Sequence, residues 1–336
     1  MKAVVYRGGG RIAAEEWPRP SIGNGELLLR LKGCGLCGSD IAKIVDPTTR
    51  VPAIFGHEFA GTVTAIGSGV SAFREGDRVV AANSAPCASC PSCRAGRPNL
   101  CEDLLFVNGA YGEFIVLPPR LVARNVVPLA ASLPAERAAF AEPLACALLA
   151  IERARVEAGQ TVVVFGHGPL GCLLGMLAAS RRARVVMVGK AGWRFDRLKH
   201  LGFARWLDAS AGHVLDAIRD DTGARGAEVT VDATGRPEVW EQAVDAVGRG
   251  GSVLFFGGCA PGTTIRLDTR RTHYEELTLL GAFHHTPEMI RRAVETLASG
   301  ALVPDSLISH RMPLEEVGQA LALMAKGEAL KVLIRA

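Results

Sequence analysis

The feature that most constrains the fold is an apolar run that leads directly into a glycine-rich turn. Residues 161–165 (Thr-Val-Val-Val-Phe) have the composition of a buried β-strand, and residues 166–171 then match the pattern G-x-G-x-x-G. Residues 170–180 continue as a predicted helix. This order of strand, glycine turn and helix is the context in which the pattern binds a dinucleotide. The segment therefore predicts a cofactor site built on a parallel sheet.

Five of the six residues of the turn have an expected role in that site. Gly166 permits the sharp turn, Gly168 lets the backbone approach a pyrophosphate, and Gly171 allows the helix to pack closely on the strand. Pro169 and Leu170 open the helix, whose N-terminal amides and positive dipole end would face the phosphates. These five residues are the first candidates for cofactor binding.

Alternation of strands and helices continues after this turn. Further strands are predicted at residues 185–188, 229–233 and 252–256, with helical segments between them. Such alternation is typical of a doubly wound parallel sheet that is covered by helices on both faces. We therefore predict an α/β fold with this sheet in the middle of the chain.

The segments on either side of the βα block differ from it. The upstream part is β-rich, with short apolar runs between Gly, Pro and Asn turns, for example at 26–31 and 78–82. Downstream, helices are predicted at 287–299 and 314–325 and a strand at 331–334. A chain of 336 residues is long enough for two domains. We expect one domain at residues 134–274 and a second formed by 1–133 together with 275–336.

Composition argues against several classes of protein. The formal net charge is only +4 and no tract concentrates lysine and arginine, so nucleic acid is not an expected partner. Residues 161–180 carry no charge, but their four glycines and Pro169 favour a strand, a turn and a helix over a membrane span. The first seven residues lack the apolar core of a secretion signal. We expect a cytoplasmic protein with no membrane contact.

Four of the nine cysteines form a compact cluster with the spacing C-x2-C-x2-C-x7-C. Four thiolates so close in sequence can close a tetrahedron around one zinc ion, which leaves no coordination position open for catalysis. The rival interpretations are an iron–sulfur cluster, whose bacterial ferredoxin spacing is absent, and unrelated thiols. Without a secretion signal, clustered cysteines indicate metal more often than disulfides. The sequence predicts a structural zinc site at Cys87, Cys90, Cys93 and Cys101.

Three further segments contain residues that bind metals, although each segment alone is weak evidence. They are Gly35-Leu36-Cys37-Gly38-Ser39-Asp40, Gly56-His57-Glu58-Phe59-Ala60-Gly61 and Ala141-Glu142-Pro143-Leu144-Ala145-Cys146. A lone cysteine is usually a core residue, and a lone His-Glu pair is usually a solvated turn. Their order along the chain, however, matches a known family.

The chain resembles the zinc-dependent medium-chain dehydrogenase/reductase superfamily, and within it the sorbitol, threonine and aminocyclitol dehydrogenase branch. Gly56-His57-Glu58, with Gly61, Gly67 and Val70, matches the zinc signature G-H-E-x2-G-x5-G-x2-V of the superfamily. Glu142-Pro143-Leu144 matches the E-P-L element of that branch, and the four cysteines lie where the family carries them. The resemblance covers essentially the whole chain. It implies a GroES-like catalytic domain at 1–133 and 275–336 and a Rossmann domain at 134–274.

The resemblance also implies a catalytic zinc site and an activity. Cys37 and His57 would bind the zinc, Glu58 would be the third ligand, and Glu142 would bind directly or through water. Zinc would polarise the oxygen of a small-molecule alcohol or ketone, while a hydride passes between a secondary alcohol and NAD(P). The expected alcohols are of the polyol, cyclitol or hydroxy-amino-acid type. With the four-cysteine site, two zinc ions per chain are expected.

Proton transfer is the step at which this sequence departs from the family. Ser39 matches the hydroxyl that begins the proton relay, although a serine at this position could also cap a helix. Many relatives have a histidine five residues after the cysteine ligand, where this chain has Ala42. The exit route of the proton is therefore open, with water or Lys43 as alternatives.

The end of the second βα strand predicts which cofactor is preferred. Enzymes that prefer NAD usually have an acidic residue there, which binds the ribose hydroxyls. This chain has Gly189, followed by Lys190 and then by Arg194, so a 2′-phosphate would find both room and positive charge. We predict that NADP(H) is preferred and that NAD(H) remains possible. The alternative is that both cations lie on a surface turn without a ligand.

By the same resemblance, Thr234 and Gly257 would contact the ribose and nicotinamide of the cofactor. Alternatively, both could simply be strand ends at which a glycine turns the chain. His284 and His285 are adjacent, but we favour a structural role for them. The resemblance also implies a homodimer or homotetramer, in which edge strands of the cofactor domains pair, with residues 252–256 as the candidate strand.

Three other functions compete with this interpretation. One is an NADPH-dependent ketone or aldehyde reductase of secondary metabolism. Another is a zinc-free quinone or enoyl reductase, a class that lacks the set of Cys37, His57 and Glu58. The third is a catalytically silent binding protein, which the fold alone does not exclude.

Overall fold

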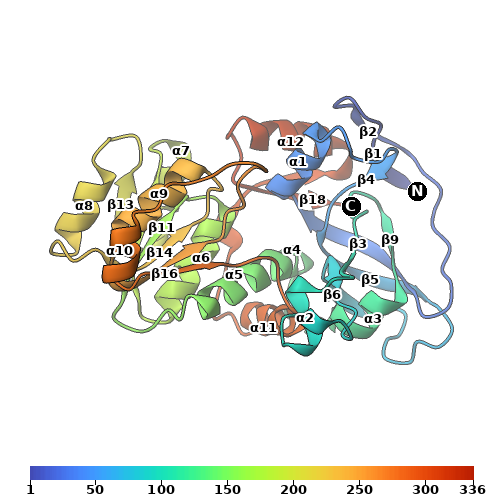
Figure 1. The fold of residues 1–336 in the computed structure, drawn as a ribbon. Coiled ribbons are helices and arrows are strands. Elements are labelled where there is room, and N and C mark those ends of the chain that lie inside the picture. Colours follow the sequence, from blue (N-terminus) through green and yellow to red (C-terminus); the bar gives the residue numbers. More distant parts are fainter. The chain divides into compact units, whose positions relative to one another are not determined.

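The computed structural model describes residues 1–336, whose ribbon is shown in Figure 1. The chain forms two compact units, one made of Met1–Ala145 with His285–Ala336 and the other of Cys146–His284. The first unit is rich in strands and the second contains a parallel sheet, which confirms the predicted α/β fold class. No helix combines the length and the apolar composition needed to cross a membrane.

The second unit is built on six strands that all run parallel. In spatial order they are β13 (Arg205–Asp208), β12 (Arg184–Gly189), β11 (Thr161–Phe165), β14 (Ala227–Asp232), β15 (Val247–Phe255) and β16 (Thr278–Gly281). Consecutive side chains of β11 are fully buried, which requires that both faces of the sheet are covered. The strand order reverses beside β11, and sheets of this type bind ligands at that point, at the carboxyl ends of their strands.

The helices of this unit connect successive strands, as Figure 1 shows. They are α6 (Pro169–Ser180), α7 (Trp193–Leu198), α8 (Val214–Asp221), α9 (Pro237–Ala246) and α10 (Thr269–Tyr274), with a short 3-10 helix η2 (Lys199–Leu201). The strands and the helix expected at 161–188 therefore form close to the predicted bounds.

The boundaries of the two units differ from the sequence-based domain boundaries at 133/134 and 274/275. The first division falls inside helix α5 (Ala141–Arg153), at Ala145/Cys146. The second falls after β16, which pairs in parallel with β15 and so belongs to the six-stranded parallel sheet of the second unit. The expectation for residues 252–256 as an edge strand is wrong, because β15 lies between β14 and β16. The edge strand at that side of the sheet is β16.

The first unit contains a larger, mostly antiparallel sheet. Its order is β10 (Val126–Pro128), β6 (Arg78–Ala81), β5 (Glu58–Ile66), β3 (Leu27–Gly35), β18 (Lys331–Arg335) and β17 (Ile308–Pro313), with β9 (Phe114–Leu117) also paired to β3. Two smaller sheets consist of β2 (Ile12–Glu16), β1 (Lys2–Tyr6) and β4 (Ala53–Ile54), and of β7 (Ser84–Ala85) and β8 (Leu105–Phe106). The last strand of the chain, β18, thus pairs with β3, a strand from the N-terminal part of the chain.

Helices of this unit are mostly short. In the N-terminal part of the chain they are α1 (Gly38–Val45), α2 (Pro91–Arg94), η1 (Pro98–Leu100), α3 (Pro119–Asn125) and α4 (Ala135–Ala138), followed by the first turn of α5. After the second unit come α11 (Pro287–Ala298), η3 (Asp305–Leu307), η4 (Leu314–Glu316) and α12 (Val317–Ala325). The helix expected at 314–325 is therefore a 3-10 turn followed by an α-helix.

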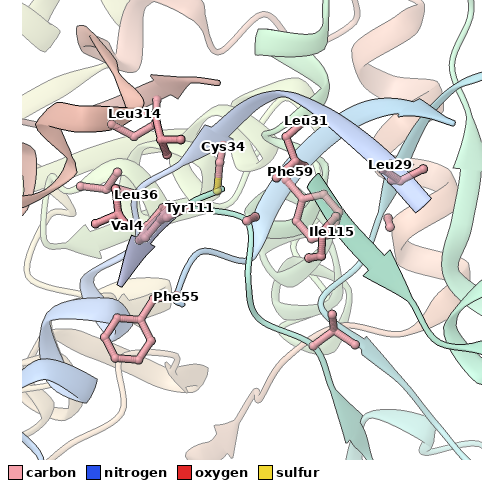
Figure 2. Close-up of a cluster of buried hydrophobic side chains, with 14 of the residues drawn as sticks. Val4, Leu29, Leu31, Cys34, Leu36, Phe55, Phe59, Tyr111, Ile115 and Leu314 are labelled. Atoms are coloured by element: carbon pink, nitrogen blue, oxygen red, sulfur yellow. The ribbon is translucent and has the colours of Figure 1, made fainter. Parts of the chain in front are cut away.

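The core of the first unit holds the ends of β3 and β5 in place. Along β3, buried Leu29 and Leu31 alternate with exposed Arg30 and Lys32, as a sheet with one solvated face requires. Figure 2 shows these leucines clustered with Phe59 of β5 and with other apolar side chains. The strand residues that precede Cys37 and follow Glu58 are thus part of the buried core.

Candidate metal centres and cofactor site

Cys37, His57 and Glu58 lie together in the first unit. Cys37 follows β3 and caps the N-terminus of α1, and Glu58 is the first residue of β5, where its backbone pairs with Gly35. One possible ligand atom from each of the three residues lies within 4.8 Å of the other two. A thiolate, an imidazole and a carboxylate form a donor set that zinc accepts. Three ligands leave a fourth tetrahedral position open.

The orientation of His57 is set by a buried acid that the sequence analysis did not single out. Asp40, in α1, is fully buried, and its Oδ1 lies 3.3 Å from Nδ1 of His57. Tyr111 donates its hydroxyl to Asp40 at 2.6 Å, and the Lys43 ammonium donates to it at 3.1 Å. Burial by itself raises the pKa of Asp40, but the interactions with His57, Lys43 and Tyr111 outweigh it and hold that pKa well below its ordinary value. A carboxylate behind a histidine in this way leaves the other ring nitrogen to face a metal.

Glu58 has a buried cationic partner that also escaped the sequence analysis. Lys331, the first residue of β18, donates to both carboxylate oxygens of Glu58, at 2.8 and 2.6 Å, and to the carbonyl of Leu36 at 2.9 Å. Burial lowers the pKa of Lys331, but the charge of Glu58 outweighs burial and raises it, so the ammonium stays protonated. The available signal was a single lysine at the start of an otherwise apolar predicted strand.

Space for the Glu58 carboxylate is left by a glycine on the neighbouring strand. A Cβ atom on Gly35 would lie less than 3.0 Å from Oε2 of Glu58, closer than real Cβ atoms approach any atom. Gly35 has no positive φ, so the backbone conformation does not require glycine there. The close approach of the carboxylate does.

Ser39 and Glu142 occupy the surroundings of this cluster. The Ser39 hydroxyl lies 3.5 Å from Nε2 of His57. Glu142, near the start of α5, is buried, and its Oε1 lies 4.0 Å from Nε2 of His285. Burial lowers the pKa of His57, but Asp40, Cys37 and then the charge of Glu142 outweigh it and raise that pKa. The Glu142 carboxylate is not in the cluster of Cys37, His57 and Glu58. His285 also contacts Oδ1 of Asn83 at 2.9 Å, so its ring is held by two side chains.

Lys43, one of the two alternatives for the proton route, is engaged elsewhere. Its ammonium donates to Asp40 and also to Oδ1 of Asn108, at 2.8 Å. Ala42, on the same helix, offers no titratable group. The helix α1 therefore supplies no continuation of a relay beyond Ser39.

The four cysteines form a second cluster in the loop around α2. One Sγ atom from each lies within 4.8 Å of the others. Backbone amides point at the sulfur atoms: Ser89 and Cys90 donate to Cys87 at 3.4 and 3.3 Å, and Cys93 donates to Cys90 at 3.4 Å. The hydrogen bonds from Ser89, with that from Cys90, lower the pKa of Cys87 to about 6. Amide donors of this kind favour the thiolate form, which is the form that binds zinc.

The glycine turn of the second unit has the geometry that its sequence predicts. β11 ends at Phe165, Gly168 caps the N-terminus of α6, and Pro169 and Leu170 form the first turn of that helix. A Cβ atom on Gly171 would lie less than 3.0 Å from the carbonyl oxygen of Gly166, so the helix could not start so close to the strand with another residue there.

The cations expected near a 2′-phosphate lie at different depths. Gly189 is the last residue of β12, and Lys190 follows it with an exposed side chain. Arg194, in α7, is half-buried, and its guanidinium carbon lies 5.7 Å from the ring centre of Trp193. Burial lowers the pKa of Arg194. Lys190 is therefore exposed to solvent, whereas Arg194 is partly covered within α7.

Thr234 and Gly257 lie at the carboxyl ends of neighbouring strands, where they are tied together by Asp232. The buried carboxylate of Asp232 accepts hydrogen bonds from the Thr234 hydroxyl at 2.6 Å, the Gly235 amide at 3.0 Å and the Trp240 indole at 3.0 Å. The Gly257 amide donates to the Asp232 carbonyl at 3.0 Å. Asp232 thus acts as the structural centre of this turn, a role that sequence analysis did not assign.

Comparison with known proteins finds two family matches along the chain. The chain matches the family model of the alcohol dehydrogenase GroES-like domain at residues 23–129 and that of the zinc-binding dehydrogenase at 169–299. D-altritol 5-dehydrogenase of Agrobacterium fabrum is 35% identical, over 94% of this chain and 94% of its own. Sorbitol dehydrogenase of Bacillus subtilis is 30% identical, over 99% and 97%.

A solved structure extends the likeness to the whole fold. A protein of Sinorhizobium meliloti, assigned as a zinc-binding dehydrogenase and bound to NADP, has a TM-score of 0.92 and 29% identity, and the match covers 100% of this chain and 99% of that one. Fold, motifs and relatives agree over the full length. The chain therefore belongs to the zinc-dependent medium-chain dehydrogenase family.

Proposed function

We propose that this chain transfers a hydride between a secondary alcohol of the polyol, cyclitol or hydroxy-amino-acid type and NAD(P). The observation that carries the proposal is the convergence of Cys37, His57 and Glu58 into one mixed donor set with a coordination position left open. Relatives named for sorbitol and altritol support the substrate class. A spectrophotometric panel of polyols, hydroxy-amino acids and cyclic ketones tests it.

The side chains around this set have separate tasks in the proposed reaction. A zinc ion held by the three residues would act as a Lewis acid on the substrate oxygen. Asp40, whose Oδ1 lies 3.3 Å from Nδ1 of His57, would help to orient the ring. Ser39, beside His57, would relay the hydroxyl proton during oxidation, passing its own proton onward as it receives one, and the reverse transfer would occur during reduction. With Ala42 and the engaged Lys43 beyond it, the proton would leave through water.

Glu142 would act on the metal site indirectly. Because its carboxylate lies with His285 outside the three-residue cluster, we propose that it acts through a hydrogen-bonded water instead of binding the metal directly. Its negative charge would stabilise a positively charged site.

Metal content separates this proposal from its competitors. Two zinc ions per chain are expected for the dehydrogenase, one at the four cysteines and one at Cys37, His57 and Glu58. A zinc-free reductase or a silent binding protein would keep at most the four-cysteine ion. Comparison of oxidation and reduction rates on the same substrate pair then decides whether the enzyme serves mainly as a ketone or aldehyde reductase.

The four-cysteine cluster would hold the second zinc and stabilise its loop. Cys90→Ser is expected to remove one zinc ion per chain and to lower the melting temperature, because binding free energy at a structural site is also folding free energy. Elemental analysis and thermal unfolding measure both quantities. Ser92→Ala, in the same loop, is the matched control. An unchanged melting temperature with full zinc content in Cys90→Ser would show that the four thiols are not a closed site.

NADP(H) is the proposed preferred cofactor, and NAD(H) remains possible. The end of β12 offers no carboxylate to ribose hydroxyls, and Arg194 lies in the adjoining helix α7. The NADP bound to the Sinorhizobium meliloti relative supports the proposal.

We expect kcat/KM for NADPH to exceed that for NADH about tenfold or more, because charge-assisted hydrogen bonds to a phosphate contribute about 1.5–3 kcal/mol. Lys190→Ala should reduce this ratio by weakening NADPH alone, and Lys326→Ala, an exposed lysine of the first unit, is the control. Rates with both dinucleotides on one substrate provide the measurement. Equal values in the wild type would contradict the preference.

A homodimer or homotetramer is the proposed assembly, and the cytoplasmic location expected from the sequence stays a prediction. β16 pairs only with β15, so its outer edge can accept a strand from a second copy. Light scattering at micromolar concentration should give a mass of at least twice 35.5 kDa. A monomeric mass would refute the assembly, and Leu280→Pro, on that edge, should produce one if β16 forms the contact.

A further inference from the structure

At the end of β12, the side chain of one residue fills the space that belongs to another position. Gly189 is buried and has no positive φ, so its backbone could carry any residue. A Cβ atom at this position, however, would lie less than 3.0 Å from Nδ1, Cγ and Cε1 of His167. The imidazole ring of His167 therefore occupies the space into which a side chain at position 189 would project.

His167 is held there from both sides. It lies in the glycine turn between Gly166, with a φ of 106°, and Gly168, the N-terminal cap of α6. Its ring packs edge-on against Phe195 of α7, with ring centres 6.3 Å apart. Phe195 in turn packs against Trp206 of β13 at 5.3 Å. The ring is thus wedged between the end of β12 and an aromatic row, and its position is part of the packed structure.

The charges around the ring are suited to an anion. Burial, and after it the positive charge of Arg194, lower the pKa of His167, so the imidazole is neutral near pH 7 and keeps one N–H donor. The charge of Arg194, on α7, acts on His167, so its guanidinium lies near the ring. The carboxylate of Asp208, on the neighbouring strand, is occupied by the Ala191 amide and by Ser210. Asp208 is therefore already engaged by backbone and hydroxyl donors of the neighbouring loops.

We propose that His167 is the residue that selects the cofactor: its ring fills the place of an acidic side chain at position 189 and donates, beside Arg194, to a phosphorylated adenosine ribose. This inference rests on the proposed dehydrogenase function and its preference for NADP(H). It assigns that preference to a residue of the glycine turn, where a variable position is not otherwise expected to read the ribose. His167 and Gly189 then act as a pair, because a side chain fits at position 189 only when the ring of His167 is removed.

The pairing makes a distinct prediction for single and double variants. Gly189→Asp alone should weaken both dinucleotides and lower the melting temperature of the cofactor-free protein, because the new side chain meets the ring of His167. His167→Ala/Gly189→Asp should recover the melting temperature and bind NADH at least tenfold more tightly than Gly189→Asp. Such non-additivity is the signature of two residues that share one space.

Single variants of His167 separate its two tasks. His167→Ala and His167→Phe should both weaken NADPH about tenfold and leave NADH within about twofold, because both lose the N–H donor. Only His167→Phe should remain incompatible with Gly189→Asp, since a phenyl ring still fills the space. His213→Ala, an exposed histidine of the same unit, is the matched control. Dissociation constants come from titration of zinc-loaded protein with NADPH and NADH, followed by nicotinamide fluorescence, and melting temperatures from the cofactor-free protein.

Three contrary results have different meanings and each overturns the inference. A wild type that binds neither dinucleotide would contradict the dehydrogenase function itself. Equal dissociation constants of the wild type for NADPH and NADH would contradict the phosphate preference. A wild type that prefers NADPH, with the preference intact in His167→Ala, would leave the proposed function standing and remove His167 from it.

Discussion

Cys37→Ala is expected to lower kcat/KM for alcohol oxidation about a thousandfold or more while NADPH binding stays unchanged. Cys37 provides the only sulfur of the three-residue cluster, so its loss removes the ligand that best retains zinc. A Lewis acid on the substrate oxygen contributes several kcal/mol to stabilising the transition state, and each 1.36 kcal/mol corresponds to about a tenfold rate change. The glycine turn that would bind the dinucleotide belongs to the other unit, Cys146–His284.

Three measurements on the same preparation make this test decisive. Initial rates follow nicotinamide absorbance, elemental analysis gives zinc per chain, and fluorescence titration gives the dissociation constant of NADPH. Cys259→Ala, which changes a cysteine outside both clusters, should keep wild-type values for all three. His57→Ala should reproduce the loss seen in Cys37→Ala. Wild-type turnover by a Cys37→Ala protein that retains only one zinc per chain would rule out the proposed chemistry.

The parts of the site that could be predicted from sequence are those set by close neighbours along the chain. The glycine turn at 166–171 and the cysteines at 87–101 each have ligand-binding groups within a few residues, so their spacing alone limits the structure. Cys37, His57 and Glu58 come from two segments, and only the order of motifs along the chain connected them. Their convergence at the ends of β3 and β5 follows from strand pairing.

Long-range partners could not be predicted, because nothing local indicates them. Lys331 lies 273 residues from Glu58, and only the pairing of β18 with β3 brings the two together. The ring of His167 reaches Gly189 because β11 and β12 are adjacent parallel strands. The same reason explains the misplaced edge strand: residues 252–256 looked suitable by composition, but strand order depends on the topology of the whole sheet.

The buried pair of Lys331 and Glu58 leads to the second large expected effect. Both side chains are almost fully buried, at 5% and 2% exposure, and the ammonium donates to both carboxylate oxygens. Removal of one partner from such a pair leaves an uncompensated charge in the interior, which costs roughly 3–5 kcal/mol. Lys331→Met is therefore expected to lower the free energy of unfolding of the zinc-depleted protein by about that amount.

Zinc should change the size of this effect. If Glu58 is a zinc ligand, the metal supplies a second positive charge to the same carboxylate, and the zinc-loaded Lys331→Met protein should lose much less stability than the zinc-depleted one. Denaturant unfolding of chelator-treated and zinc-loaded samples measures both values. Lys326→Met, an exposed lysine just before β18, should change neither.

A double variant distinguishes charge from packing. Lys331→Met with Glu58→Gln removes both charges, and it should recover most of the stability of the zinc-depleted protein because no uncompensated charge remains. It should also lose the catalytic zinc, since an amide is a poor replacement for the carboxylate. If Lys331→Met costs the same with and without zinc, then Glu58 is neutralised by Lys331 alone. In that case the coordination of the metal must be completed by another group, and Glu142, whose charge already acts on His57, is the residue to test next.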